Sequence, residues 1–249
     1  MRSARLLNWD GCVNVRDLGG LPTEDGTETT YGAVVRADNI GTLSDKGREQ
    51  LLNYGVKRVI DLRWIDERNE DPQLELGVDV LHLPLFGDHN ERHDADRRLL
   101  ERIPDHAECR RVMYLEHMDA YAERFATAVA AVASAPEEGC VLVHCAGGVD
   151  RTGLIAALLL RLAQVSIGDV AADFALSRTN WAPHAREWIA ETEDEREREF
   201  RRFLAAMPGE SMLGVLEEVD RRYGGAESYL RSAGLSDSDL RRAHARLRA

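Results

Sequence analysis

The chain has 249 residues, of which 44% are hydrophobic and 31% charged, and its formal net charge is -12 at pH 7. This length and composition suffice for one globular domain with a sizeable core, and we expect residues 1–249 to form a single domain. An excess of acidic residues on average repels nucleic acid and anionic lipid, so neither is an expected partner.

No apolar run is long enough for a membrane span or for the centre of a signal peptide. The longest run, 154–160, ends at Arg161, well short of the ~20 residues that cross a bilayer. The four cysteines lack the paired spacing of a disulfide framework or a zinc site. We therefore expect a cytoplasmic protein with reduced cysteines and no stable membrane insertion.

Short elements alternate along the first part of the chain. Residues 11–36 are rich in Gly and Thr, which predicts extended pieces joined by turns. A helix is expected over 44–54, with Ser44 as its N-cap. The β-branched run 56–62 and the run 78–85 predict buried strands.

The second part of the chain begins with a segment crowded with charged residues and histidine, 87–109, which favours a solvated excursion or lid. A long amphipathic helix is expected over about 110–134. The compact apolar run 140–145 predicts a strand, and 152–165 predicts an almost wholly apolar helix packed against a sheet.

The remainder, 169–249, is interpreted as helices of the same domain, separated at Pro183 and at several glycines. Strands that alternate with helices favour an α/β fold. We expect a mostly parallel central sheet flanked by helices, with a helical C-terminal region.

The segment that carries chemistry is HCAGGVDRTG, residues 144–153. Cys145 ends a predicted strand, two glycines turn the chain, and a helix begins near Thr152, so successive backbone N–H groups can surround one anion. A helix N-terminus and a nearby cation also favour the thiolate, the nucleophilic form of cysteine. The pattern therefore predicts a cysteine nucleophile beneath a phosphate cradle.

Each further position of this segment has an expected role. The planar fork of Arg151 can hold two phosphoryl oxygens, and Thr152 can donate its hydroxyl to the cysteine sulfur. Two glycines permit positive φ and close approach of the backbone to the phosphate, and His144 can support the loop from behind. The expected phosphate-binding residues are Ala146, Gly147, Gly148, Val149, Asp150 and Arg151.

This segment resembles the signature loop of the protein tyrosine phosphatase superfamily, and the chain is similar to the bacterial tyrosine-protein phosphatases, a family that includes lipid and dual-specificity phosphatases. The similarity extends to Asn14-Val15-Arg16-Asp17-Leu18-Gly19-Gly20, Tyr31-Gly32 with Arg36 and Asp38, Asp61-Leu62-Arg63 with Glu67, Tyr223-Gly224-Gly225 and Tyr229-Leu230. The resemblance implies a single phosphatase domain that uses no metal or other cofactor and forms a phosphocysteine on Cys145.

The resemblance also implies a phosphorylated substrate, either protein phosphotyrosine or a phosphorylated small molecule or lipid headgroup. Such bacterial enzymes often carry lysine, which is associated with phosphoinositide substrates, where this chain has Val149. The valine favours protein phosphotyrosine. A phosphoinositide phosphatase with the same mechanism and a phospho-ligand binding module without turnover stay open as alternatives, whereas a sulfurtransferase does not require the Arg151-Thr152-Gly153 ending.

Two aspartates compete for the role of general acid, the group that protonates the leaving oxygen. The resemblance suggests an aspartate after the Leu83-Pro84 strand, which is Asp88. Asp150 is the rival, because some lipid phosphatases use the aspartate inside an Asp-Arg-Thr loop. We favour Asp88, while noting that it could be an ordinary solvated charge and that Asp150 could only brace the loop.

The charged segment after residue 87 also contains several potential metal ligands: Asp88, His89, His93, Asp94 and Asp96. A metal site needs converging ligands with a satisfied second shell, which a run of charged loop residues does not supply, so no metal site is predicted. Arg36 and Arg63 either reach the phosphate pocket or act as structural ion-pair partners.

Overall fold

The computed structural model describes residues 5–71 and 75–248, and within them the strands form one five-stranded sheet in the order β1-β2-β5-β3-β4. The strands are β1 (Arg16–Asp17), β2 (Val34–Ala37), β3 (Val56–Asp61), β4 (Asp79–His82) and β5 (Cys140–His144). Only the β1–β2 pair is antiparallel among these described strands. The predicted α/β fold with a mostly parallel sheet is confirmed.

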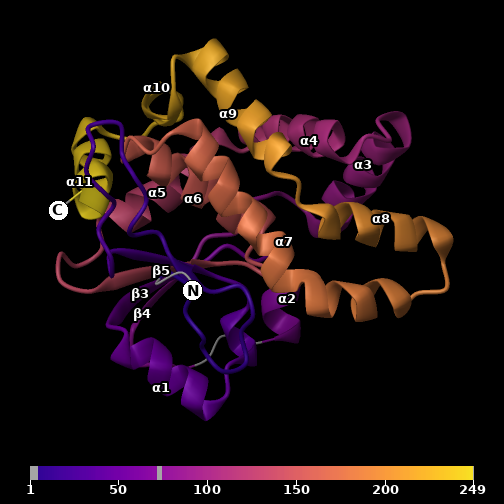
Figure 1. The fold of residues 1–249 in the computed structure, drawn as a ribbon, viewed down its shortest axis with the longest axis horizontal. Helices are drawn as coiled ribbons and strands as arrows, with labels where there is room; N and C mark the ends of the chain where they lie inside the picture. Colours follow the sequence, from indigo (N-terminus) through magenta and orange to yellow (C-terminus); the bar gives the residue numbers. More distant parts are fainter. Residues whose placement is uncertain (1–4, 72–74, 249) are drawn as a thin grey trace.

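Helices cover both faces of the sheet, with α1 (Asp45–Asn53) on one side and α5 (Ala122–Ala133) and α6 (Asp150–Leu162) on the other (Figure 1). The middle strand β5 therefore buries side chains in both directions. Val141 and Val143 belong to the hydrophobic cluster of α5 and α6, and Leu142 belongs to the cluster of α1. A strand buried on both faces is a continuous apolar run, as the sequence shows.

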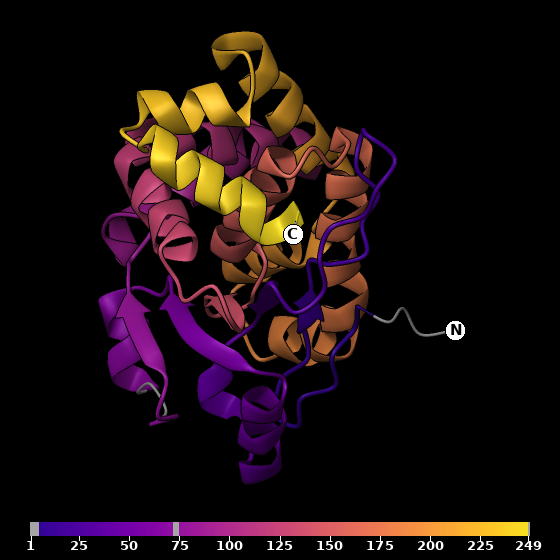
Figure 2. The same cartoon turned by 90° about the vertical axis from the view of Figure 1, so that its left-hand side faces the viewer.

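The C-terminal region is helical, as predicted, and gathers on the α5–α6 side of the sheet (Figure 2). Its helices are α7 (Ile167–Ala190), α8 (Glu195–Ala206), α9 (Gly209–Tyr223), α10 (Ala226–Ser232) and α11 (Asp237–Arg248). Phe203, Leu216 and Leu247 join the same hydrophobic cluster as Val143 of the sheet.

The segment 87–109 corrects the sequence interpretation, because it is largely helical rather than a solvated excursion. It contains α3 (His89–Arg102) and the start of α4 (His106–Ala120). Asp96, Leu99 and Leu100 of α3 are buried, and since the two leucines are its only large apolar residues, the helical period is hard to recognise in the sequence. Movement of this segment as a lid stays a prediction.

Two helix boundaries also differ from the predictions. The helix expected over 110–134 is broken at Tyr121, between α4 and α5, where the Tyr121 ring stacks against Phe86. Pro183 does not separate helices but lies inside α7. Proline has no N–H, so the carbonyl of Thr179, one turn earlier, lacks its helical donor. Both residues are exposed, so water can hydrate that carbonyl.

The carboxyl ends of the parallel strands β2, β3, β4 and β5 meet at one edge of the sheet, the usual location of ligand sites in such folds. The segments that follow them include η1 (Ile40–Thr42), α2 (Ile65–Glu70), α3 and α6. Among the described helices, none has the length and apolar character needed to cross a bilayer.

Candidate active site

The loop between β5 and α6 turns its carbonyl oxygens outward. The donors are His144 Nδ1 for Cys145 (3.3 Å), the Asn39 backbone N–H for Ala146 (2.8 Å), Trp181 Nε1 for Gly147 (2.7 Å), Arg36 Nη2 for Gly148 (2.9 Å) and the Gly153 backbone N–H for Val149 (2.7 Å). Asn14 Nδ2 donates to both Gly147 (3.1 Å) and Gly148 (3.2 Å). In a trans peptide the C=O and the following N–H point in opposite directions. The N–H groups of residues 146–149 therefore face the inside of the loop.

These four N–H groups have no acceptor among the described residues. Cys145, which is 2% exposed, lies at the start of the same loop. Backbone donors in a largely buried setting require an acceptor, and successive inward N–H groups form an anion-binding concavity. The geometry thus suits an anion bound next to the cysteine sulfur.

Gly148 is the loop position that requires glycine. Its φ is +65°, and a Cβ there would lie 2.5 Å from the carbonyl oxygen of Ala37 on β2. The expectation of positive φ is wrong for Gly147, which is absent from the positive-φ residues of the described chain. A Cβ at Gly147 would make only an ordinary contact of 3.6 Å with Trp181.

Arg151 is held by a bidentate ion pair with Glu67 of α2, in which Nη2 lies 2.8 Å from Oε1 and Nη1 bonds Oε2. Burial alone would lower the pKa of Arg151, but the hydrogen bonds and charge of Glu67, together with Cys145, raise it above its usual value. The Arg151 guanidinium also stacks 4.0 Å from the Trp64 ring.

Glu67 bonds the end of the Arg151 guanidinium formed by Nη1 and Nη2. No acceptor among the described residues takes Nε–H or the second hydrogen of Nη2, which together form the side-on edge that can bind two phosphoryl oxygens. Glu67 is itself fixed, because its Oε2 accepts from the Trp64 amide at 2.7 Å. The sequence pointed to Glu67 only through the resemblance and gave no signal for the stacked Trp64.

Thr152 and His144 lie where the sequence predicts, immediately around the loop. Thr152 is fully buried, and its Oγ1 has no hydrogen-bond partner among the described residues. Burial lowers the pKa of His144 to about 4, so the ring is neutral at neutral pH and its Nδ1 donates to the Cys145 carbonyl. The donation from Thr152 to the sulfur stays a prediction.

Arg36 contacts the loop from outside. Its Nη2 donates to Gly148, and its Nη1 lies 2.8 Å from Asp173 of α7. Asp173 also pairs with Arg16 at 3.1 Å and with Arg5, and these arginines hold its pKa well below the usual range although burial would raise it. The sequence had left open whether Arg36 reaches the pocket, and the structure makes it a buried brace of the loop.

Arg63 is a structural ion-pair partner. Its Nη2 lies 2.8 Å from Asp61, and its Nη1 donates to Asn39 at 3.0 Å. The side-chain oxygen of Asn39 accepts from Arg63, while the backbone N–H of Asn39 donates to the Ala146 carbonyl. Arg63 therefore supports the loop indirectly. Neither Asn39 nor Trp181 was singled out in the sequence, because only the tertiary fold brings them to the loop.

Asp150 is the first residue of α6 and adjoins the phosphate loop directly. Its Oδ1 accepts from the Tyr114 hydroxyl at 2.6 Å and from Nη1 of Arg110. Both partners belong to α4 and are completely buried. The sequence gave no signal for either of them.

Asp88 has a different environment. It is exposed and is the N-cap of α3, where its Oδ1 accepts from the Glu91 amide at 3.0 Å. It lines a groove of about 750 Å³ together with Trp64, His89 and Arg124. Neither Cys145 nor Arg151 lines this groove, which we call the rim.

The potential metal ligands after residue 87 have other partners. Asp88 caps its helix, and Nδ1 of His89 lies 2.6 Å from Asp66. Within the described ranges, no group of three or more His, Cys, Asp or Glu side chains is arranged to hold a metal ion. All four cysteines lie in those ranges and are free.

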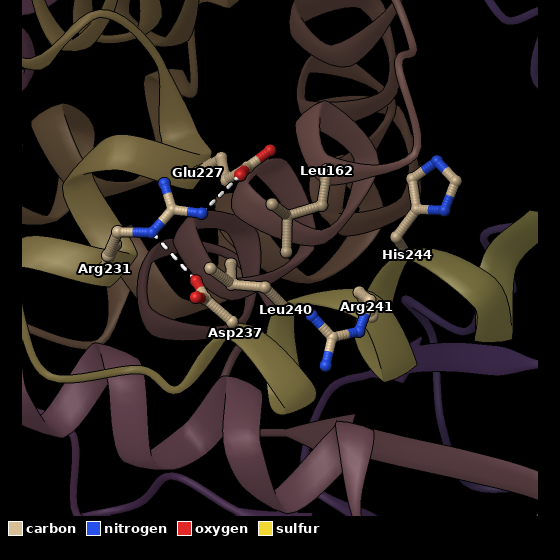
Figure 3. A pocket seen from close by; sticks show the side chains of 7 residues that line it. All are labelled: Leu162, Glu227, Arg231, Asp237, Leu240, Arg241 and His244. Atoms are coloured by element: carbon tan, nitrogen blue, oxygen red, sulfur yellow. Dashed lines mark hydrogen bonds and ion pairs between the residues drawn. The ribbon is translucent and has the colours of Figure 1, made fainter.

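A second pocket, of about 490 Å³, lies between α6, α10 and α11 and contains none of the predicted site residues. Two arginines line it, Arg231 and Arg241, and Arg231 is bonded to Glu227 at 2.8 Å and to Asp237 at 3.0 Å (Figure 3).

Comparison of the sequence with known proteins defines the class of protein: a family model described as the tyrosine phosphatase family matches residues 7–249. The chain belongs to this family of enzymes. It is similar to a tyrosine-protein phosphatase of Nostoc commune, with 31% identity over 233 residues, which are 86% of this chain and 74% of that protein. It is also similar to the triple specificity protein phosphatase PtpB of Mycobacterium tuberculosis, with 28% identity over 93% of this chain and 95% of that protein.

Proposed function

We propose that this chain is a protein-tyrosine phosphatase that hydrolyses phosphomonoesters through a phosphocysteine on Cys145. One observation carries the proposal: the N–H groups of residues 146–149 face inward without an acceptor among the described residues, next to Cys145 and Arg151. Donors held in place before the reaction stabilise charge on the transferring phosphoryl group without reorganisation.

In the first step, the Cys145 thiolate attacks phosphorus. The S–P bond forms while the P–O bond to the leaving group breaks, and an aspartic acid gives its proton to the leaving oxygen. The loop N–H groups and the side-on edge of Arg151 hold the equatorial oxygens. This step uses only groups of the protein and needs no cofactor.

In the second step, a water molecule attacks phosphorus and the P–S bond breaks. The aspartate accepts the proton of the water, and inorganic phosphate leaves. Thr152 donates its hydroxyl to the departing sulfur in this proposal. Its buried Oγ1, which has no partner among the described residues, supports that role.

We favour Asp150 over Asp88 as the proton carrier, although the sequence favoured Asp88. Asp150 adjoins the loop and is held at one oxygen by two buried donors, whereas Asp88 is exposed and serves as a helix cap. A carboxyl group fixed next to the reacting phosphate is better placed to transfer a proton than an exposed one at the rim.

Protein phosphotyrosine is the proposed substrate class because the valine at 149 adds no charge for a polyanionic headgroup, and because similar proteins carry protein phosphatase names. The test is a panel of phosphotyrosine, phosphoserine and phosphothreonine peptides, phosphoinositides and an aryl phosphate, with and without chelator. Chelator-resistant hydrolysis that is fastest on phosphotyrosine supports the proposal. Faster hydrolysis of phosphoinositides would overturn the proposed substrate class. No hydrolysis of any substrate would overturn the proposal that the protein is an active phosphatase.

A further inference from the structure

Asp150 is bonded through one oxygen only. Both donors, the Tyr114 hydroxyl and Nη1 of Arg110, bond Oδ1, and no donor among the described residues bonds Oδ2. A carboxyl oxygen that already accepts two hydrogen bonds is a poor place for the acid proton. The proton of the acid form therefore belongs on Oδ2, which fixes the oxygen that exchanges it.

The two donors are built to stay in place. Tyr114 is completely buried, and burial and the charge of Asp150 raise its pKa well above the usual value, so its hydroxyl stays protonated and remains a donor. Arg110 is likewise completely buried. Asp150 is its carboxylate partner, and Nη2 donates to the carbonyl oxygens of Phe203 at 2.7 Å and Leu204 at 3.0 Å in the last turn of α8.

Burying an arginine and a tyrosine hydroxyl costs free energy unless both are fully bonded. The carboxyl group that both donors share, Asp150, is nevertheless 30% exposed at the loop. A purely structural counterion would be expected to lie with its partners in the interior. The arrangement instead directs two buried donors at the side chain that adjoins the phosphate loop.

We infer that Tyr114 and Arg110 are positioning residues for the phosphatase reaction, which hold Oδ1 of Asp150 so that Oδ2 carries the proton between leaving group and water. This inference rests on the proposed function and on Asp150 as proton carrier. The charged and titratable groups that act on Asp150 are Tyr114 and Arg110 from α4 and, through its charge, Arg151 from α6.

The test is Tyr114→Phe, assayed on phenyl phosphate, a poor leaving group, and on 4-nitrophenyl phosphate, a good one. Loss of one hydrogen bond to a charged group should lower kcat on phenyl phosphate about ten-fold, with a smaller loss on 4-nitrophenyl phosphate and little change in KM. Because the hydroxyl orients the carboxyl group that carries the proton, its removal should also displace the alkaline limb of the kcat profile.

The matched control is Tyr229→Phe, which removes another buried hydroxyl, bonded to the Met118 carbonyl at 2.8 Å far from the loop. It should leave the pH profile and the leaving-group dependence unchanged. Arg110→Lys, which cannot bond Asp150 and two carbonyls in the same plane, should have a larger effect than Tyr114→Phe.

Two results would overturn the inference, and they differ from failure of the proposed function. If Tyr114→Phe keeps the wild-type pH limb and leaving-group dependence while Asp150→Asn loses the limb, Tyr114 does not position the acid. If Asp150→Asn keeps the limb, the inference falls with Asp150 as proton carrier. In either case an inactive Cys145→Ser would still uphold the phosphocysteine mechanism.

Discussion

The phosphate loop and the rim around Asp88 lie at the same edge of the sheet but are built differently. In the loop, every carbonyl from 145 to 149 has a donor, and His144 and Arg36, which bond two of these carbonyls, are buried. At the rim, Asp88 is exposed, and His89 pairs with the half-exposed Asp66 and stacks on the ring of Trp64. The difference suggests that phosphate binding is fixed before substrate arrives, while the rim remains free to contact the rest of the substrate.

The largest effect is expected at the base of the loop. Cys145→Ser should lower turnover by about 10⁴-fold or more, because the hydroxyl is a far weaker nucleophile, while phosphopeptide binding persists. Initial rates and calorimetric binding measure the two quantities. Cys12→Ser, at a half-buried cysteine outside the loop, should keep full turnover, and an active Cys145→Ser would refute the nucleophile.

Replacing Asp150 and Asp88 by asparagine in separate variants sharpens the comparison between loop and rim. Asp150→Asn should lower kcat by about 10³-fold and remove the alkaline limb of the pH profile. Asp88→Asn should change kcat only slightly, and since asparagine caps helices as well as aspartate does, the start of α3 is preserved. The reverse pattern would assign the acid to Asp88, as the sequence interpretation did.

Glu67→Gln tests whether the ion pair orients the phosphate clamp. Without the carboxylate, Arg151 loses its bidentate partner, and kcat/KM should fall about 10²-fold through misplacement of the guanidinium. Glu227→Gln removes an exposed ion pair with Arg231 and is the matched control. Equal kcat/KM for both variants would mean that the Glu67 pair is only structural.

Thr152→Val should slow the second chemical step by about ten-fold, because the departing sulfur loses one donor. Rapid mixing would then reveal a larger burst of leaving group before steady turnover. Valine matches threonine in shape, so folding is expected to persist. A burst and steady rate identical to those of the wild type would exclude a role for the hydroxyl.

The smallest expected effect concerns acid stability. Burial raises the pKa of Asp61, but its bonds with Arg63 and the nearby His144 outweigh burial and lower it from 3.8 to about 2. A carboxylate whose pKa is lowered by folding stabilises the folded state above its unfolded pKa, and this stability is lost as the pH falls. For Asp61 the loss is about 2 kcal/mol and occurs between about pH 4 and pH 2. Urea unfolding of Asp61→Asn should therefore show a smaller loss across that range, and an identical loss would contradict this account.

The sequence predicted the phosphate loop well because strand, turn and helix are contiguous in it. The fold class followed for a similar reason, since apolar runs alternate with helical segments. The residues that brace the loop come from separate elements that only packing unites. Glu67 and Arg36 were named only through the resemblance, without their contacts, and Trp181 was not named. Arg110 and Tyr114 are indistinguishable in the sequence from other helix residues.

The sequence interpretation was wrong where charged residues outnumber the apolar residues that mark the buried side of a helix. In α3 only two leucines mark the buried side, so 87–109 was interpreted as an excursion. Tyr121 breaks a helix because of a tertiary contact with Phe86, which no local signal announces. The extent of the domain, the cytoplasmic location and the substrate class stay predictions.

The most direct measurement is to mix the protein with a labelled phosphotyrosine peptide, quench in acid within one turnover and map the label. We expect a single labelled peptide, with phosphate on Cys145, and none when Cys145→Ser is used. Turnover without any cysteine-bound phosphate, or label on another residue, would contradict the account.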